Sequence, residues 1–422
     1  MMRWLAMLLS VCVVTGCGRG APSASEEGGN TAPEASAAVH AEASGSVTEP
    51  RVSRLEALRP ESMPEGFALV TEPRRFEFPR DHGPHPEYRH EWWYVTGHLD
   101  AANGEQFGFE LTFFRFALKP LAASPAVVPQ SAWRARQIYM AHFAVTDLDR
   151  GRFHAAERFS RDALALSGAE AEPFRVWLED WSLGEASGQE PASGLAASSG
   201  KARSWRLHAR DAGYEFDLEL RSDSTPVLNG DAGFSRKSAE PGAASYYYSM
   251  PRMSTHGRIV RDGRTFDVNG FSWLDREWGS GSLGGDQQGW DWFALQLDDG
   301  SALMFYALRK RNGERDAHSA GTWVSPDGVT KALSSDDVQI EVKDFWTSPR
   351  GGRYPARWQL HVPSLALDVD VRPRMQDQEL DLSTRYWEGA ATIEGTRAAR
   401  PVGGRAYVEL VGYAAAPDDP VN

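Results

Sequence analysis

The stretch NGFSWLDREWGSG, residues 269–281, places charged residues between two tryptophans. Asp275, Arg276 and Glu277 are flanked by Trp273 and Trp278. A carboxylic acid desolvated by aromatic rings has a raised pKa and can stay protonated near neutrality. Such an acid can protonate an alkene, and aromatic faces can stabilise the resulting carbocation. The stretch therefore predicts either a general acid at Asp275, held against both tryptophans, or a structural turn in which the acids accept backbone N–H groups.

Three consecutive tyrosines precede this stretch, in SYYYSMPRMSTHGRI (245–259). The two segments are expected to pair as a β-hairpin around Arg-Asp-Gly, so that Tyr246 and Tyr248 converge with Trp273 and Asp275 within one barrel. Structural packing explains the tyrosines equally well. Arg276 should point to the opposite face if the strand is extended. If Arg276 paired with Asp275 instead, it would lower the pKa of that acid and remove the proposed chemistry.

Further candidates lie in DHGPHPEYRHEWWY (81–94), whose histidines and acids lack the tight spacing of a metal motif such as HExxH. We therefore predict no metal site here, and we interpret His90 and Glu91 as a polar cluster packed against Trp92 and Trp93. His142 lies on a predicted strand, where a histidine is more often structural than catalytic. The residues that we assign to ligand binding are His90, Glu91, Trp92, Tyr94, His142, Trp278 and Trp292. The sequence has no GxSxG elbow and no phosphate-binding glycine loop, so it predicts no bound cofactor.

Strands must position these residues, because the apolar pattern from residue 90 onward has a period of two. In EQFGFELTFFR (105–115), every second residue from Phe107 to Phe113 is apolar and shares one face. Turn sequences such as DDG, RDG and SPDG separate the strands, as in antiparallel meanders. The best helical stretch is short, at residues 160–168. The predicted fold class is therefore all-β.

The chain also repeats itself. Residues 92–115 return as 291–309, residues 205–221 as 358–372, and residues 263–271 as 404–413. Three matches in the same order indicate a duplication. We therefore predict two tandem antiparallel β-barrels, at residues 60–283 and 284–422, with Trp205 and Trp358 on equivalent strands.

The N-terminus, MMRWLAMLLSVCVVTGCGRG, has an apolar core that is too short to span a bilayer and ends in VTGC, which resembles a bacterial lipobox. Residues 1–16 are thus expected to be a lipoprotein signal peptide, although an ordinary secretory signal is the alternative. Cys17 would carry the lipid, and residues 17–59 would form a flexible tether. The predicted location is the bacterial cell envelope, on the periplasmic face of the outer membrane.

This anchoring can be tested directly. A Cys17→Ala protein should leave the washed membrane fraction, because it has no thiol to be acylated. Immunoblotting of soluble and membrane fractions, beside the parent protein, measures the change. Equal membrane partitioning of the two proteins would contradict lipidation at Cys17.

The composition narrows the possible partners. A formal net charge of −13, without a basic stripe, argues against nucleic acid. The two cysteines are Cys12, inside the predicted signal peptide, and Cys17, so the mature chain would have none left for a disulfide or a zinc cage. Fifteen tryptophans favour an aromatic-lined interior or pocket, and the expected partner is a hydrophobic small molecule.

Five stretches, HEWWYVTGHL, YMAHFAVTD, YYYSMPRM, GFSWLDREWGSG and GWDWFALQLDDGSALMFYALR, resemble the AttH-like and carotenoid 1,2-hydratase (hydroxyneurosporene synthase) family. The resemblance covers about residues 65–415 and implies two lipocalin-like β-barrels. Its best-understood members add water across a terminal double bond of a long isoprenoid, and fungal relatives are thought to guide cyclisation. Their pattern of an aromatic residue two positions before an acid falls on Trp273 and Asp275, with Trp where the hydratases carry Tyr. Their earlier aromatic and polar pair falls near residues 246–248.

Two functions remain open from the sequence. One is a hydratase or cyclase-like enzyme acting on an apolar isoprenoid or lipid-like substrate. The other is a non-catalytic periplasmic carrier of a hydrophobic ligand. Both need an apolar cavity, so the discriminating feature is whether a desolvated Asp275 reaches that cavity.

Overall fold

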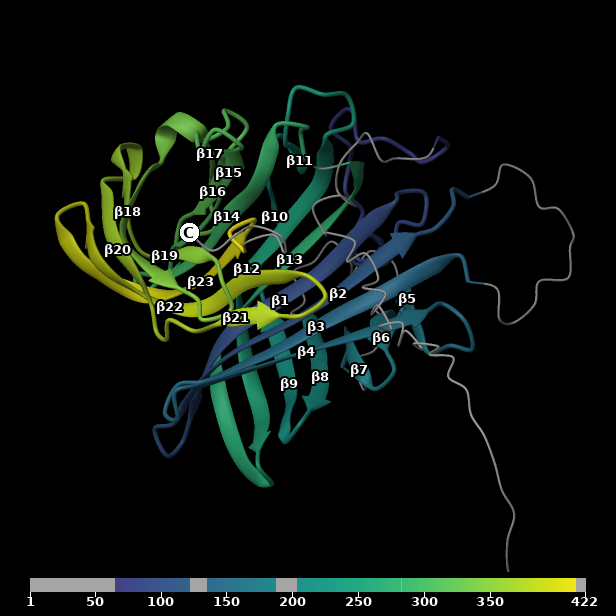
Figure 1. Ribbon diagram of the computed structural model, residues 1–422, viewed down its shortest axis with the longest axis horizontal. Helices are drawn as coiled ribbons and strands as arrows, with labels where there is room; N and C mark the ends of the chain where they lie inside the picture. Colours follow the sequence, from purple (N-terminus) through teal and green to yellow (C-terminus); the bar gives the residue numbers. More distant parts are fainter. Residues whose placement is uncertain (1–64, 122–134, 187–202, 282, 415–422) are drawn as a thin grey trace, which may run out of the picture. The chain divides into compact units, whose positions relative to one another are not determined.

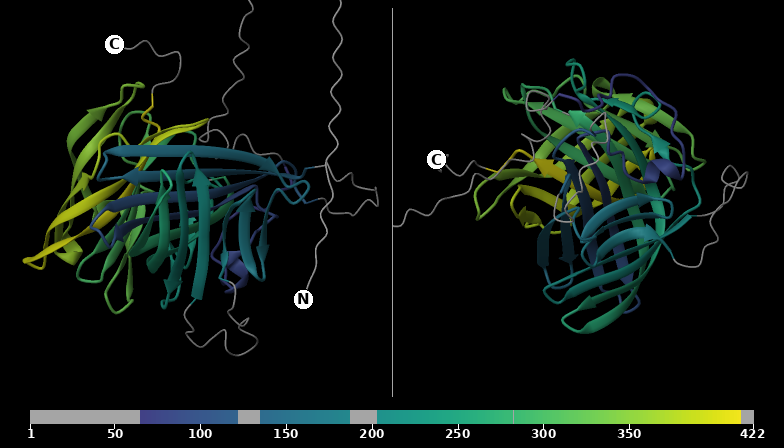
Figure 2. Two further views of the ribbon diagram at one scale, coloured as in Figure 1. Left: turned by 90° about the horizontal axis from the view of Figure 1, so that it is seen from below. Right: turned by 90° about the vertical axis from the view of Figure 1, so that its right-hand side faces the viewer.

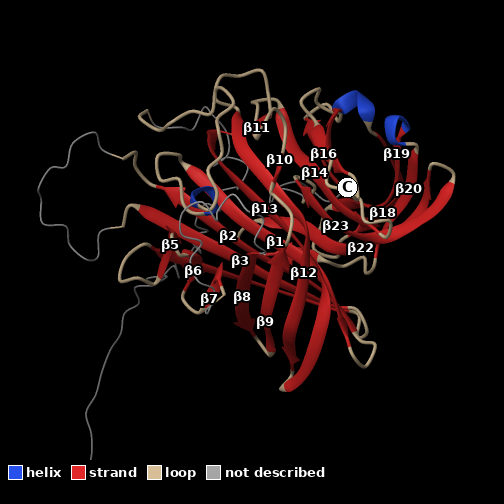
Figure 3. Cartoon of the chain, turned by 180° about the vertical axis from the view of Figure 1, so that it is seen from behind, coloured by secondary structure: helices blue, strands red, loops and turns tan. Residues whose placement is uncertain are grey.

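The computed structural model describes residues 65–121, 135–186, 203–281 and 283–414. The predicted signal peptide, the tether and the lipidation site at Cys17 lie outside these ranges. The described residues belong to one compact unit and are almost entirely strand (Figure 3). None of the helices in these ranges is long and apolar enough to cross a membrane.

Strands from the first part of the chain form one antiparallel sheet. They are β1 (His90–Ala101), β2 (Gln106–Ala117), β3 (Gln137–Asp147), β4 (Arg152–Arg161), β5 (Ser167–Ala171), β6 (Phe174–Leu178), β7 (Trp181–Glu185), β8 (Arg203–Asp211), β9 (Tyr214–Ser222), β10 (Val227–Leu228), β11 (Phe234–Arg236), β12 (Ala244–Arg261) and β13 (Arg264–Gly281). Their order is β4-β3-β2-β1-β13-β12-β9-β8-β7-β6-β5, with β10 and β11 paired to β12. Antiparallel pairing of β1 with β13, which are far apart in the sequence, joins the two halves of this sheet.

The remaining strands form a second antiparallel sheet. They are β14 (Gln287–Leu297), β15 (Ala302–Lys310), β16 (Ala320–Val324), β17 (Thr330–Ser334), β18 (Gln339–Thr347), β19 (Arg353–Val362), β20 (Leu367–Pro373), β21 (Glu379–Asp381), β22 (Arg385–Arg397) and β23 (Arg400–Val411). Their order is β17-β16-β15-β14-β23-β22-β20-β19-β18, with β21 paired to β22. Short 3-10 turns occur at η2 (Arg80–His82), η4 (Ser335–Asp337) and η5 (Pro363–Leu365).

The two sheets follow the same strand order, which confirms the predicted duplication. The third sequence match is out of register, however, because Gly263 lies in the turn between β12 and β13 whereas Gly404 lies within β23, opposite Leu297. Strands β14 to β17 occupy the places of β1 to β4, and β23 and β22 those of β13 and β12. Trp205 lies on β8 and Trp358 on the equivalent β19, as expected. The first sheet continues past β7 into β6 and β5, which have no counterpart beyond β18 among the described strands.

Both sheets are strongly curled (Figure 1 and Figure 2). Each has its own apolar core, and a third apolar cluster contains residues of both sheets. Phe143 and Phe216 stack in the first core, and Phe293 packs edge-on against Trp358 in the second. Among the described strands, no pairing joins the two ends of either sheet path, so the lipocalin-like barrels are partly open.

Residues 160–168, the best short helical candidate in the sequence, do not form a helix. Strand β4 continues to Arg161, and Leu164 and Ala165 both adopt a left-handed φ of 56°. The chain then turns so that Ser167 can pair opposite Leu178 on β6. Pairing at the sheet edge therefore overrides the weak helical pattern.

Candidate active site between the two sheets

The chemistry-bearing stretch lies on β13, which forms the predicted hairpin with β12. Since side chains alternate along a strand, the odd-numbered residues 273–277 and the even-numbered residues 274–278 point in opposite directions. Trp273, Asp275 and Glu277 face the second sheet. Arg276 points the other way, where its guanidinium lies 4.0 Å from the centre of the Trp93 ring. An ion pair between Arg276 and Asp275, which would have removed the proposed chemistry, is thus ruled out by their directions.

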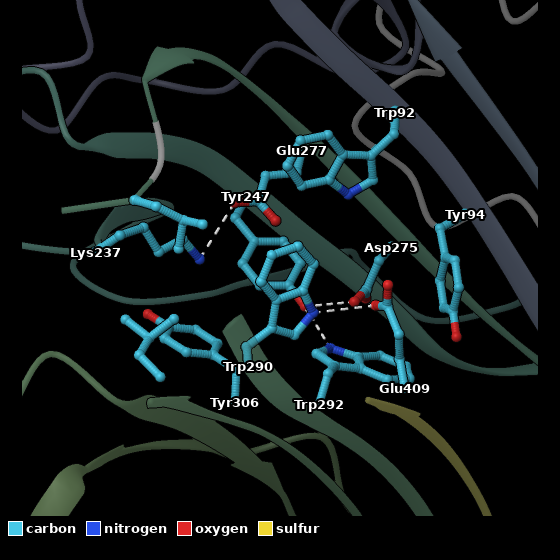
Figure 4. A pocket seen from close by; sticks show the side chains of 12 residues that line it. Trp92, Tyr94, Lys237, Tyr247, Asp275, Glu277, Trp290, Trp292, Tyr306 and Glu409 are labelled. Carbon is cyan, nitrogen blue, oxygen red and sulfur yellow. Dashed lines mark hydrogen bonds and ion pairs between the residues drawn. The ribbon is translucent and has the colours of Figure 1, made fainter. Parts of the chain in front are cut away.

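A cavity of about 70 Å³ lies between the sheets at this point. Its aromatic walls are Trp92, Tyr94, Tyr247, Trp290, Trp292 and Tyr306 (Figure 4). Four charged residues also line it: Lys237, Asp275, Glu277 and Glu409. An aromatic cavity with a few convergent polar groups is typical of a small-molecule site.

Asp275 is the best-defined acid in this cavity, and its side chain is held by three donors. Its Oδ1 accepts hydrogen bonds from Trp273 Nε1 at 2.7 Å and from Ser249 Oγ at 2.6 Å, and its Oδ2 accepts one from the Tyr247 hydroxyl. Only 4% of Asp275 is exposed. Burial raises the pKa of Asp275 to about 7, and it outweighs these hydrogen bonds, which lower the pKa. A substantial fraction of Asp275 is therefore protonated near neutral pH, as a general acid requires.

Tyr247 connects the two sheets at the site. Trp292 Nε1, on β14, donates a hydrogen bond to the Tyr247 hydroxyl at 3.1 Å, and that hydroxyl donates to Asp275. Burial and the neighbouring Asp275 raise the pKa of Tyr247 well above its ordinary value, so its phenol stays protonated. The position of Asp275 therefore depends on residues from both halves of the chain.

The opposite end of the cavity contains a buried ion pair. Lys237 Nζ lies 3.2 Å from Glu277 and 3.9 Å from the centre of the Tyr306 ring. Burial lowers the pKa of Lys237, but Glu277 and Tyr306 outweigh it, so the pKa is raised overall. Lys237 is thus positively charged, and the pair forms a charged end of the cavity, away from Asp275 (Figure 4).

The structure brings some of the predicted residues to this cavity and leaves others away from it. Trp92, Tyr94, Trp292 and Asp275 line it, and Trp273 contacts Asp275. Tyr246, Tyr248 and Trp278 belong instead to the core of the first sheet. The predicted convergence of the two tyrosines with Asp275, and the predicted contact of Asp275 with Trp278, are therefore wrong.

The side chains of Tyr246, Tyr248 and Trp278 contact the segment 65–89, which precedes β1. Phe76 packs edge-on against Tyr246 and Phe78 against Tyr248, with ring centres 6.0 and 5.1 Å apart. The Tyr248 hydroxyl lies 2.6 Å from His82 Nδ1. Trp278 stacks on the His85 ring at 3.8 Å. The segment that precedes β1 therefore packs against these three side chains.

Tyr247 was missed because a β-bulge changes the register of the hairpin. Near the turn Arg261 lies opposite Arg264, and counting strictly from there would put Asp275 opposite Met250, with Tyr246 and Tyr248 on its face. A register shift between Met250 and Met253 places Asp275 opposite Ser249 instead. The sequence does contain an indicator of this shift, since Pro251 lacks the N–H that a central strand needs and so favours a bulge.

Glu91 lies away from the cavity, in a buried ion network. It is fully buried and pairs with both Arg115 and Arg276. Burial raises the pKa of Glu91, but the two guanidinium groups outweigh it and hold the pKa well below the usual range. Glu91 is therefore a permanently charged structural residue that connects β1, β2 and β13.

The two predicted histidines also lie outside the cavity lining. The His90 ring stacks on Trp92 with centres 5.9 Å apart, and burial lowers its pKa to about 3. The His142 ring bridges the Tyr386 hydroxyl at 2.7 Å and Glu157 at 2.9 Å. His142 thus contributes to contacts between the two sheets. Within the described ranges, no group of three His, Cys, Asp or Glu residues could hold a metal ion.

Comparisons with known proteins agree with this architecture. The AttH-like family model matches residues 69–413. A candidate AttH protein from Nitrosomonas europaea is 32% identical, with 83% of this chain and 100% of that chain covered and a TM-score of 0.71. Kievitone hydratase from Nectria haematococca shares the fold at 16% identity, with 83% and 97% covered and a TM-score of 0.60. No curated protein sequence matches the chain. The chain belongs to the AttH-like family.

Proposed function

We propose that this protein is a hydratase that adds water across a carbon–carbon double bond of an isoprenoid or lipid-like molecule. The observation that carries the proposal is Asp275, a buried acid with a pKa near 7 that lines an aromatic cavity. The acid can donate a proton to the alkene, and the aromatic rings can stabilise the carbocation that forms. The structural relative named kievitone hydratase supports the same reaction class on the same fold.

The residues of the site define the first chemical step. Protonated Asp275 gives its proton to one carbon of the double bond, and a carbocation forms at the other. The developing carboxylate is stabilised by the donors Trp273, Ser249 and Tyr247. The faces of Trp92 and Trp290, which line the cavity, stabilise the positive charge. Water then attacks the cation, and loss of one proton from the bound water gives the alcohol.

The substrate would reach the cavity from the membrane of the cell envelope. We propose that acylation of Cys17 and the tether at residues 17–59 hold the enzyme at the outer membrane, where apolar substrates partition. The polar pair formed by Lys237 and Glu277 favours a substrate with a polar group at one end, because a buried charged pair is poorly matched by hydrocarbon.

A carrier of hydrophobic ligands is the second candidate, since the cavity walls are largely aromatic. The four charged side chains in the lining argue against it, because a carrier of apolar ligands gains nothing from desolvating them. A carrier would bind the ligand and return it unchanged.

Isotope labelling distinguishes the two. The probe compound is geraniol, geranylgeraniol or squalene. We choose the one that is chemically most similar to the compounds that mass spectrometry finds co-purifying with the protein. In H₂¹⁸O, the enzyme should yield an alcohol with one ¹⁸O, and in D₂O an alcohol with one carbon-bound deuterium. Heat-inactivated protein is the control. Tight binding of a probe without any labelled alcohol would favour the carrier.

A further inference from the structure

The duplicated fold places a second acid in the same cavity. On β13 the aromatic residue Trp273 precedes Asp275 by two positions, and on β23 Tyr407 precedes Glu409 by two. Because β13 and β23 hold equivalent places in the two sheets, the two motifs lie on equivalent strands. Both acids line the cavity between the sheets.

Strand register supports this equivalence residue by residue. Tyr94 on β1 lies opposite Asp275, and its counterpart Trp292 on β14 lies opposite Glu409. The two pairs meet at one end of the cavity, where the Tyr94 and Trp292 rings pack edge-on with centres 5.1 Å apart. A molecule in the cavity therefore has a carboxyl group from each sheet within its surroundings.

The Glu409 side chain is buried in the cavity wall and accepts a hydrogen bond. It is 7% exposed, and its Oε2 accepts a hydrogen bond from Trp290 Nε1 at 3.3 Å. Glu409 lies opposite Trp292, whose ring packs edge-on against the ring of Tyr94, and Tyr94 lies opposite Asp275. Figure 4 shows the Glu409 and Asp275 side chains at the same end of the cavity, whereas Lys237 lies at the other.

Asp275 is poorly suited to complete the reaction alone. After it has given its proton to the alkene, its two oxygens still accept three hydrogen bonds, from Trp273, Ser249 and Tyr247. These bonds occupy both oxygens of the carboxylate and hold it at the carbon that it protonates, whereas water must attack the other carbon. A second group is needed to hold the attacking water and to take its proton.

We propose, on the premise that the chain is the hydratase described above, that Glu409 is the base that orients and deprotonates the attacking water. The alkene carbon gains a proton from Asp275, the water oxygen bonds to the cationic carbon, and the released proton passes to the Glu409 carboxylate. Proton return from Glu409 to Asp275 through solvent restores the site. The net change is the addition of one water to one double bond.

The test separates protonation from hydration, using Glu409→Gln protein and geraniol in D₂O. The variant should form alcohol about 100-fold more slowly, as expected for loss of a general base. Asp275 can still deuterate the alkene reversibly, so deuterium should continue to appear in recovered geraniol at close to the parental rate. That exchange also shows that the variant is folded. Glu409→Asp, which keeps a carboxylate one methylene further back, should recover part of the hydration.

A control variant and the parent protein show whether a negative result contradicts the role of Glu409 or the hydratase proposal itself. Glu394→Gln makes the same change at an exposed position on β22 and should match the parent. Parental hydration by Glu409→Gln, or equal loss of hydration and exchange, would overturn the role of Glu409 while leaving the hydratase proposal in place. If the parent itself forms neither alcohol nor deuterated geraniol, and the same holds for geranylgeraniol and squalene, the hydratase proposal and the role of Glu409 both fail.

Discussion

Asp275→Asn protein is expected to turn over its isoprenoid substrate about 100- to 10,000-fold more slowly than the parent, the usual cost of losing a general acid. Asparagine keeps the shape of the side chain and still offers an acceptor to Trp273, but it has no acidic proton for the alkene. Affinity should change little, because the aromatic walls of the cavity supply most of it. Steady-state turnover and equilibrium binding, measured on the same preparations, test both parts.

The pH dependence adds a second measurement. Activity of the parent should fall as the pH rises through about 7, because the protonated form of Asp275 is lost. A raised pKa in the folded state means that the folded protein binds more protons than the unfolded chain between about pH 4 and 7. The free energy of unfolding should therefore decrease as the pH rises through this range, and Asp275→Asn should abolish that contribution.

A matched control for Asp275 lies on the same strand. Asp267 is exposed on β13, so Asp267→Asn should leave turnover and the pH profile unchanged. If Asp275→Asn matches the parental rate on a substrate that the parent hydrates, Asp275 is structural and another group must donate the proton.

Glu91→Gln is expected to lower the free energy of unfolding by about 3–5 kcal/mol, as found when one partner of a buried ion pair is removed. The substitution leaves Arg115 and Arg276 buried without the charge that stabilises them. Urea denaturation followed by tryptophan fluorescence measures the change. Arg276 neighbours Asp275 in sequence, so local loosening of β13 should also reduce turnover.

The sign of the pH effect follows from the lowered pKa of Glu91. A carboxyl group with a lowered folded-state pKa contributes stability above its unfolded pKa of about 4.3, and this stability is lost as the pH falls further. The difference between parent and Glu91→Gln should therefore be largest near neutral pH. Asp223→Asn removes one partner of the exposed Arg221–Asp223 pair and should cost less than about 1 kcal/mol. An equally small cost at Glu91 would show that the network contributes little.

The sequence by itself determined the strands, the duplication and the hairpin that carries the acid. Alternating apolar residues are a local property, and the pleat of a strand turns them directly into a buried and an exposed face. The repeated segments 205–221 and 358–372 predicted equivalent strands for Trp205 and Trp358, because each of them covers two consecutive paired strands. The opposed directions of Asp275 and Arg276 followed from the same alternation.

Only the tertiary structure decided which residues join Asp275. The bulge between Met250 and Met253 reverses the faces of the tyrosine run, so Tyr247 rather than its neighbours reaches the acid. The contact of Trp292 with Tyr247, like the pairing of Glu91 with Arg276, joins residues far apart in the chain. Strand periodicity specifies a face but not what covers it. Residues 65–89 pack against one face of β13, in the core of the first sheet, and the second sheet packs against the other face. The cavity therefore lies between the sheets, on the face that carries Asp275. These contacts join distant parts of the chain, so the sequence pattern alone could not predict them.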